Sequence, residues 1–308
     1  MLGRLKYVSK EQCMTAKRIF KTREEVLKAI KKKENLDGAS LKGIDLSHAD
    51  LSGARLVEAC LDGCNLQRAN LESAHLYKAS FKNSDLFNAN LTNANIKESD
   101  MTGANLLEVK LDGTKLFGIQ WGPQSKVNNE IQGLSLEKLG KRKKAKAKFR
   151  EAEEIYRNIR IHLMNAGVFE EAADFFYREM VSRRKQLNLF SIKRLSSKAI
   201  DILCGYGEKT FRVIICAAAL VFVNAVLFFI FGIQYKNQIL MFEFSNSWNQ
   251  NINEFFLSLY YSVVTLTTLG YGDIIPLGMS KAFAGIEAFL GAFMMALFVL
   301  VFGRKMMR

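Results

Sequence analysis

Nine residues near the C-terminal end, Thr-Leu-Thr-Thr-Leu-Gly-Tyr-Gly-Asp at 265–273, are the part of this chain best suited to chemistry. Glycine accepts backbone conformations that other residues avoid, so Gly270 and Gly272 allow successive carbonyl oxygens to point the same way. Four such rows of oxygens around one axis would replace the water shell of a dehydrated cation. The sequence therefore predicts ion binding by main-chain oxygens, and it contains no Walker motif, metal cluster or nucleophile constellation typical of an enzyme.

Two long apolar runs flank this stretch. Residues 211–233 contain one clearly polar side chain, Asn224, after Arg212 at the start, and residues 282–302 contain one charged side chain, Glu287. At 1.5 Å per residue each run would form a helix of roughly 30–35 Å, which matches the hydrocarbon core of a bilayer, about 30 Å. The sequence therefore predicts two transmembrane helices.

The distribution of lysine and arginine predicts how these helices cross the membrane. The segments before the first run and after the second run are basic, whereas the segment between the runs contains only Lys236 and Lys281. The basic residues outside the runs are Lys193, Arg194, Lys198, Lys209, Arg304, Lys305 and Arg308. Because positive charge marks the cytoplasmic side, we expect both termini in the cytoplasm, the loop 234–281 outside, and a multi-pass protein of the cell (inner) membrane. Residues 1–33 are basic and lack a signal-peptide pattern.

The loop between the runs is expected to re-enter the membrane. Asn253 is a suitable N-cap, with Glu254 in the first turn of a helix over residues 254–267. Such a helix is too short to cross a bilayer, so the chain must return through residues 268–272. Irregular backbone at that depth is tolerated only where it is buried in protein or lines a water-filled path.

The motif Thr-x-x-Thr-x-Gly-Tyr-Gly-Asp resembles the pore of potassium channels, and the resemblance covers about 100 residues from Phe211 onward. It implies a homotetramer with one filter strand, 268–272, from each copy, and no cofactor other than the permeant K⁺. The oxygens that bind K⁺ would belong to Thr268, Leu269, Gly270 and Tyr271, followed by Gly272.

Other residues are expected to support this filter. Thr265 and Asp273 complete the motif, and we expect Tyr271 to be braced against Tyr260 and Tyr261. Two positions depart from the family. Leu269 replaces the commonest valine, and this leaves a weakly selective cation channel as an alternative. Val264 replaces a carboxylate that pairs with the filter aspartate in some relatives, so Asp273 is expected to lack that partner.

The second apolar run contains a candidate gate. Glycine weakens helical rigidity, so Gly291 can act as a bend point. The spacing from Gly291 predicts a pore-lining stripe that can close as an apolar constriction: Gly291, Ala292, Met295, Val299 and Phe302. Glu287 is a functional candidate because an acid in a membrane helix is costly. We expect it near Thr265 or Thr267, where it would brace the filter; the alternative is a carboxylate that faces the cavity and attracts cations.

Residues 34–118 repeat with a period of five, which is neither a helix nor a strand period. Small residues precede most of the apolar centres by two positions, as in Ala49-Asp50-Leu51 and Ala89-Asn90-Leu91, a pattern that resembles pentapeptide repeats. The resemblance implies a right-handed quadrilateral β-helix with four repeats per coil and about four coils. The centres are Leu36, Leu41, Leu46, Leu51, Leu56, Leu61, Leu66, Leu71, Leu76, Phe81, Leu86, Leu91, Ile96, Met101, Leu106, Leu111 and Leu116.

The remaining segments are expected to be a basic N-terminal helical segment (1–33), a linker (119–140), a helical hairpin (141–188), and an interfacial helix with its linker (189–210), before the pore domain (211–303). The hairpin buries little alone and must pack on the solenoid, the membrane helices or a sister subunit. The net charge of +14 lies outside the mildly acidic repeats. We attribute it to contact with an anionic inner leaflet rather than with nucleic acid. The five cysteines are expected to be reduced.

The sequence as a whole favours a passive, potassium-selective channel that carries a cytosolic pentapeptide-repeat domain. This domain either biases gating through the first membrane helix (211–233), or it only assembles and localises the channel. A rival interpretation from another class is a membrane-tethered interaction scaffold with an inactive pore. The intact motif at 268–273 argues against it. No residue pattern identifies a gating ligand or a protein partner.

Overall fold

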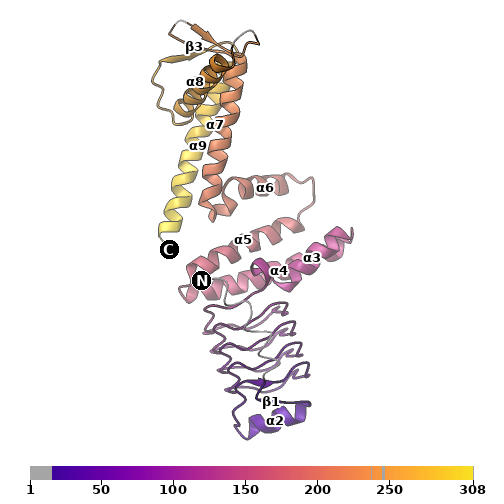
Figure 1. Cartoon of the computed structure of the whole chain (residues 1–308). Coiled ribbons are helices and arrows are strands. Elements are labelled where there is room, and N and C mark those ends of the chain that lie inside the picture. The colour runs from indigo at the N-terminus through magenta and orange to yellow at the C-terminus, as the bar shows by residue number, and fades with distance from the viewer. Residues whose placement is uncertain (1–15, 237, 245–246, 308) are drawn as a thin grey trace. The chain divides into compact units, whose positions relative to one another are not determined.

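The computed structural model describes residues 16–236, 238–244 and 247–307. The chain divides into two compact units, residues 1–194 and 195–308 (Figure 1). The first unit contains the repeats and the helical hairpin. The second contains the two apolar helices and the Gly-Tyr-Gly stretch.

The repeats of the first unit wind as a stack of flat coils (Figure 1). Parallel bridges join residues twenty apart, from Ser40 with Cys60 to Asp100 with Gln120, so each coil contains four pentapeptides. Successive coils are joined by main-chain hydrogen bonds, such as the 2.7 Å bond from Leu46 N to Asn65 O. Every apolar centre of the repeat is buried inside the stack. This arrangement matches the β-helix that the repeats imply.

Each corner of a coil has a local chemical cause. The residue two positions after a centre adopts a left-handed backbone, as at Gly53 (φ 63°) and Glu58 (φ 57°). The Asp or Asn before a centre accepts a hydrogen bond from the main chain two residues on, as Asp45 does from Ser47 N at 2.9 Å. Such Asx turns stabilise tight corners. The repeat therefore alternates a small inward residue, a turn-forming residue and an apolar centre.

Helices close both ends of this stack (Figure 1). At one end, strand β1 (Arg18–Ile19) pairs with β2 (Ala39–Ser40), and α2 (Arg23–Lys31) buries Val26 and Ala29. At the other end lie α3 (Asn128–Lys138), α4 (Arg142–Asn165) and α5 (Phe169–Gln186). The rings of Trp121 and Phe175 meet edge to face at 5.3 Å. One apolar core thus runs from the coils into the hairpin, so the hairpin packs on the solenoid, one of the three expected surfaces.

Two features of the described residues, the linker and one cysteine, differ from expectation. The expected linker 119–140 contains a short 3-10 turn, η1 (Pro123–Ser125), and the helix α3. Cys64, Cys204 and Cys216 are free, whereas Cys60 is disulfide-bonded, so the expectation that every cysteine is reduced was wrong there. Of the N-terminal helical segment expected over residues 1–33, residues 1–15 lie outside the described residues.

The helix α6 (Ile192–Cys204) and the 3-10 turn η2 (Gly205–Gly207) lead into the first of the two apolar helices. The apolar runs form α7 (Thr210–Phe231) and α9 (Ser280–Met306), both long and apolar enough to cross a membrane. Between them lies α8 (Trp248–Leu266), which packs against both. Its Tyr261 ring meets Phe228 of α7 edge to face at 4.8 Å.

A small sheet brings both ends of the loop between α7 and α9 together. Strand β3 (Ile233–Tyr235), directly after α7, pairs antiparallel with β4 (Gln238–Leu240) and with β5 (Ile274–Pro276), directly after the Gly-Tyr-Gly stretch. The chain therefore leaves α7 and returns beside the same end of that helix. The expected N-cap Asn253 was wrong: α8 begins at Trp248, and the side chain of Ser247 accepts the hydrogen bond from Gln250 N.

Candidate functional site: the exposed Gly-Tyr-Gly segment

The candidate filter begins where α8 ends. The N–H groups of Thr268 and Leu269 still donate to Thr265 O and Val264 O, at 3.0 and 3.1 Å. Beyond them the backbone becomes irregular and turns left-handed at three places, Thr268 (φ 56°), Gly270 (φ 56°) and Gly272 (φ 76°). A side chain disfavours this region. The two glycines therefore stand where a Cβ would strain the chain, as the motif predicts.

Residues 268–273 are all exposed in a single chain. Leu269 retains 57% and Tyr271 66% of its accessible surface. Tyr271 makes no ring-to-ring contact with the residues that the structure describes, and the expected brace against Tyr260 and Tyr261 stays a prediction. Irregular backbone between membrane-length helices cannot face lipid. This surface therefore needs cover by protein or by water.

Asp273 has a partner that the sequence did not reveal. Val264 provides no carboxylate, as expected, but the hydroxyl of Tyr260 donates to Asp273 Oδ2 at 3.1 Å. Tyr260 and Asp273 stand thirteen residues apart on opposite sides of the irregular segment. Their bond therefore ties the end of the segment back to α8.

Glu287 of α9 is fully buried and touches α8 at Ser262, with a hydrogen bond between the Ser262 hydroxyl and the carboxyl group. The same hydroxyl lies 2.9 Å from Val221 O of α7, so one serine links three helices. We expected Glu287 near Thr265 or Thr267; its hydrogen-bond partner is instead Ser262, one turn before Thr265, and both threonines donate to carbonyls of their own helix. Glu287 is therefore buried between the helices of one chain, whereas the alternative requires a carboxylate that is exposed to the cavity.

Gly291 lies one helical turn beyond Glu287 on the same buried face of α9. A Cβ built on Gly291 would lie 2.0 Å from Leu266 O, the carbonyl of the last residue of α8. Gly291 is therefore a close-approach glycine beside the candidate filter, apart from the rest of the expected stripe. The other four members of that stripe are exposed on α9: Ala292, Met295, Val299 and Phe302.

The other ends of α7 and α9 meet at the turn η2. Glu208, directly after η2, pairs with Arg304 near the end of α9 at 3.3 Å. Arg212 in the first turn of α7 pairs with Asp201 of α6 at 2.5 Å. The chain has a second Gly-Tyr-Gly at 205–207, which lacks upstream threonines and forms the 3-10 turn η2. Nothing in the sequence relates Glu208 to a residue almost one hundred positions away.

Comparison with known proteins finds family matches in two parts of the chain. Residues 215–308 match the ion channel family, and residues 35–68, 64–103 and 82–118 match pentapeptide repeats, in 8 copies. The chain combines an ion channel domain with pentapeptide repeats. Both resemblances drawn from the motifs are confirmed by these matches. The ion channel domain and the two apolar helices indicate a membrane protein.

Solved structures similar to this chain are pentapeptide repeat proteins. One from the cyanobacterium Cyanothece 51142 shares 36% identity over 30% of this chain and 63% of its own, with a TM-score of 0.29. One from Nostoc PCC 7120 shares 24% over 32% of this chain and 95% of its own, with a TM-score of 0.23. One from the Arabidopsis thaliana thylakoid lumen shares 22% identity over 36% of this chain and 79% of its own, with a TM-score of 0.16. This chain thus spans less than two thirds of the Cyanothece protein. None of the curated proteins matches the chain.

Proposed function

We propose that this ion channel domain conducts K⁺ passively through a filter made by residues 268–272 of four copies. The observation that carries the proposal is the exposed, irregular segment with left-handed backbone at Thr268, Gly270 and Gly272. Four copies around one axis would cover this segment and direct its carbonyl oxygens at a shared ion path. The C-terminal end of α8 adds to the attraction for cations, because a helix C-terminus carries partial negative charge.

The expected supporting residues fit this assembly. Tyr271, exposed in one chain, would be covered by a neighbouring copy. The Tyr260–Asp273 hydrogen bond would hold the outer end of the filter from within each copy. The exposed face of α9, which includes Met295, Val299 and Phe302, would line the inner path and form its apolar constriction.

We further propose that both termini lie in the cytoplasm and that α6 rests on an anionic inner leaflet of the cell membrane. The apolar side chains Ile192, Leu195 and Ile202 of α6 remain 84%, 70% and 55% exposed. The same helix contains Lys193 and Lys198. An exposed apolar stripe with lysines is typical of a helix in the membrane interface.

Flux from reconstituted vesicles tests the channel function and its alternatives. We expect K⁺ efflux well above Na⁺ efflux; equal fluxes would instead favour a weakly selective cation channel. Gly270→Ala should abolish K⁺ flux while the tetramer assembles, because the added Cβ meets a left-handed backbone. Gly285→Ala is the matched control, since that glycine of α9 has open space around it. No flux from an assembled wild-type protein would favour the scaffold interpretation.

Gating by the cytosolic unit is supported by the ion pair between Glu208 and Arg304. Because Glu208 follows α6 and Arg304 ends α9, force on α6 would reach the inner helix as well as the outer one. Deleting residues 1–120 would be a poor test, since it removes Trp121's neighbours and opens the core shared with the hairpin. Deletion of residues 1–188 removes that core entirely. A tetramer with unchanged open probability would then assign the first unit to assembly or localisation only.

A further inference from the structure

A basic pocket lies at the end of the hairpin from which the chain continues to the membrane helices. It has a volume of about 160 Å³, close to that of a cavity that accommodates benzene, about 150 Å³. The pocket is formed by the end of α3, the start of α4, the end of α5 and the start of α6. Its lining is Glu137, Arg142, Lys143, Ala145, Lys146, Phe149, Lys185, Leu187, Asn188, Leu189 and Arg194.

Positive charge in the pocket exceeds negative charge. Glu137 is the one acid among the lining residues, and it pairs with Lys185 at 2.7 Å and with Arg194 at 3.9 Å. Lys146 donates to the neutral amide of Asn188 at 2.9 Å. Arg142 and Lys143 have no ion pair with any residue that the structure describes. The cations on the α4 side of the pocket therefore lack carboxylate partners.

The start of α4 adds to this excess. Acidic residues usually occupy the first turn of a helix, where free N–H groups carry partial positive charge. The first turn of α4 instead contains Arg142, Lys143 and Lys144, with no acid and no capping side chain. Three cations thus stand at the positive end of a helix of 24 residues. An anion in the pocket would relieve both the side-chain and the helix charge.

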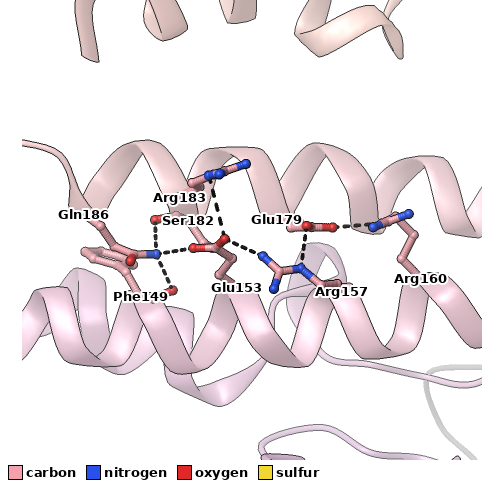
Figure 2. A network of polar contacts seen from close by, with 8 residues as sticks. All are labelled: Phe149, Glu153, Arg157, Arg160, Glu179, Ser182, Arg183 and Gln186. Carbon is pink, nitrogen blue, oxygen red and sulfur yellow. Dashed lines mark hydrogen bonds and ion pairs between the residues drawn. The ribbon is translucent and has the colours of Figure 1, made fainter. Parts of the chain in front are cut away.

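Further along the same two helices, several arginines pair with carboxylates of the chain itself (Figure 2). Arg157 and Arg160 both pair with Glu179, at 3.1 and 2.8 Å, and Arg157 also pairs with Glu153 at 2.7 Å. Glu153 further accepts a hydrogen bond from Gln186 at 2.6 Å. This network holds α4 and α5 together directly beside Phe149 and Lys185 of the pocket. These arginines therefore have carboxylate partners within the chain, whereas Arg142 and Lys143 of the pocket pair with no carboxylate of the described residues.

We propose that this pocket binds a phosphate-bearing anion. Arg142 and Arg194 offer planar guanidinium groups that suit phosphate oxygens, and Lys143 and Lys146 add point charges. The same chemistry belongs to a soluble pyrophosphate-containing compound and to the headgroup of an anionic lipid. Arg194 lies in the first turn of α6 and already donates to Leu187 O at 2.9 Å. A bound anion would thus fasten the start of α6 to the hairpin.

Modification of lysine by acetic anhydride, read by mass spectrometry on the full-length protein, tests this site. Millimolar pyrophosphate in detergent should slow the modification of Lys146 several-fold while Lys42 and Lys110, exposed on the solenoid, are unaffected. Protection in phosphatidylglycerol nanodiscs but not in phosphatidylcholine nanodiscs, with none from pyrophosphate, would assign the anion to a lipid headgroup. Protection of Lys146 by neither agent would overturn the proposal.

A pair of double variants separates a site from general charge attraction. Arg142→Gln/Lys143→Gln should remove the protection of Lys146, because both side chains line the pocket and have no other ion pair to lose. Lys42→Gln/Lys110→Gln removes the same charge from the solenoid and should leave the protection intact. If both double variants lose the protection of Lys146 equally, the protection reflects net charge alone, and the proposed anion site is refuted. Unchanged thermal unfolding would show that the exposed substitutions leave the first unit folded.

Discussion

Gly291→Ala tests the contact between the inner helix and the base of the candidate filter. The new Cβ would lie 2.0 Å from Leu266 O, 2.8 Å from its carbonyl carbon and 2.9 Å from its Cα, whereas real Cβ contacts are essentially never below 3.0 Å. All three atoms are backbone, so no side chain can rotate away. The helices must therefore separate by about 1 Å at this point, the difference between 2.0 and 3.0 Å.

Two energies of opposite sign decide the effect on stability. Replacing glycine by alanine inside a helix favours the helix by roughly 0.5–1 kcal/mol. Overpacking a close contact costs roughly 1–3 kcal/mol. The net loss is about 1–2 kcal/mol, which an assembled channel can tolerate. The shift itself matters more, because Leu266 O is two residues from Thr268, and in enzyme sites a misplacement of 1 Å costs about 100-fold in rate.

We expect Gly291→Ala to lower K⁺ flux by at least about ten-fold and to reduce the preference for K⁺ over Na⁺, measured in vesicles with assembly checked by size exclusion. Gly285→Ala, in the same helix with nothing within 4 Å, should behave as wild type. A glycine that acts only as a bend point would change open probability and leave ion selectivity untouched. That outcome, or wild-type flux, would refute the contact argument.

Three further outcomes are expected. Glu287→Gln should preserve K⁺ flux, because the amide can still form a hydrogen bond with Ser262, whereas Glu287→Ala should reduce the flux. Loss of flux in both variants at low ionic strength would instead favour a carboxylate that faces the cavity. In single-channel recordings, the open probability should shift several-fold in Glu208→Lys and in Arg304→Glu, and it should return to the wild-type value when both changes are combined. Additive shifts in the combined variant would exclude coupling between the two residues. Burial raises the pKa of the Cys64 thiol to about 11 from 9.0, so its thiolate at pH 8 is about 100-fold scarcer than in the unfolded chain. Cys64 should therefore resist iodoacetamide until the protein is unfolded, and rapid labelling of the native protein would contradict this.

The features predictable from sequence are those with a strong local or periodic cause. The five-residue repeat places every centre inside the coils, because a fixed period leaves one inward direction per repeat. The apolar runs 211–233 and 282–302 predicted α7 and α9 to within a few residues, but α9 continues beyond its run to Met306. The helix α3 was missed because its apolar residues do not follow one face, so its burial depends on the hairpin beside it. Ser247 and Asn253 are both good N-caps, and local chemistry alone could not choose between them.

Side-chain partners across helices were harder to predict. The sequence identified Glu287 as a buried acid of interest, but placed it beside Thr265 or Thr267 rather than Ser262. The two threonines lie one turn or more along α8 from Ser262, so the error is a displacement along the same helix. Which turn of α8 meets α9 depends on how closely the two helices approach. Gly291 determines that distance, because it allows α8 to approach closely. From the sequence alone, a glycine that allows close approach cannot be told from a glycine that allows the helix to bend.

The contacts of Glu287 and Gly291 together limit where α9 can bend. Glu287 meets Ser262 and Gly291 meets Leu266, so partners four residues apart on α9 match partners four residues apart on α8 in the same order. These two contacts fix the register of the helices beside the filter, and a bend there would break both. Arg304 holds the other end of α9 to Glu208. In the proposed channel, motion that opens the ion path while the filter stays intact would therefore occur between Ala292 and Gly303, the stretch that contains Met295, Val299 and Phe302.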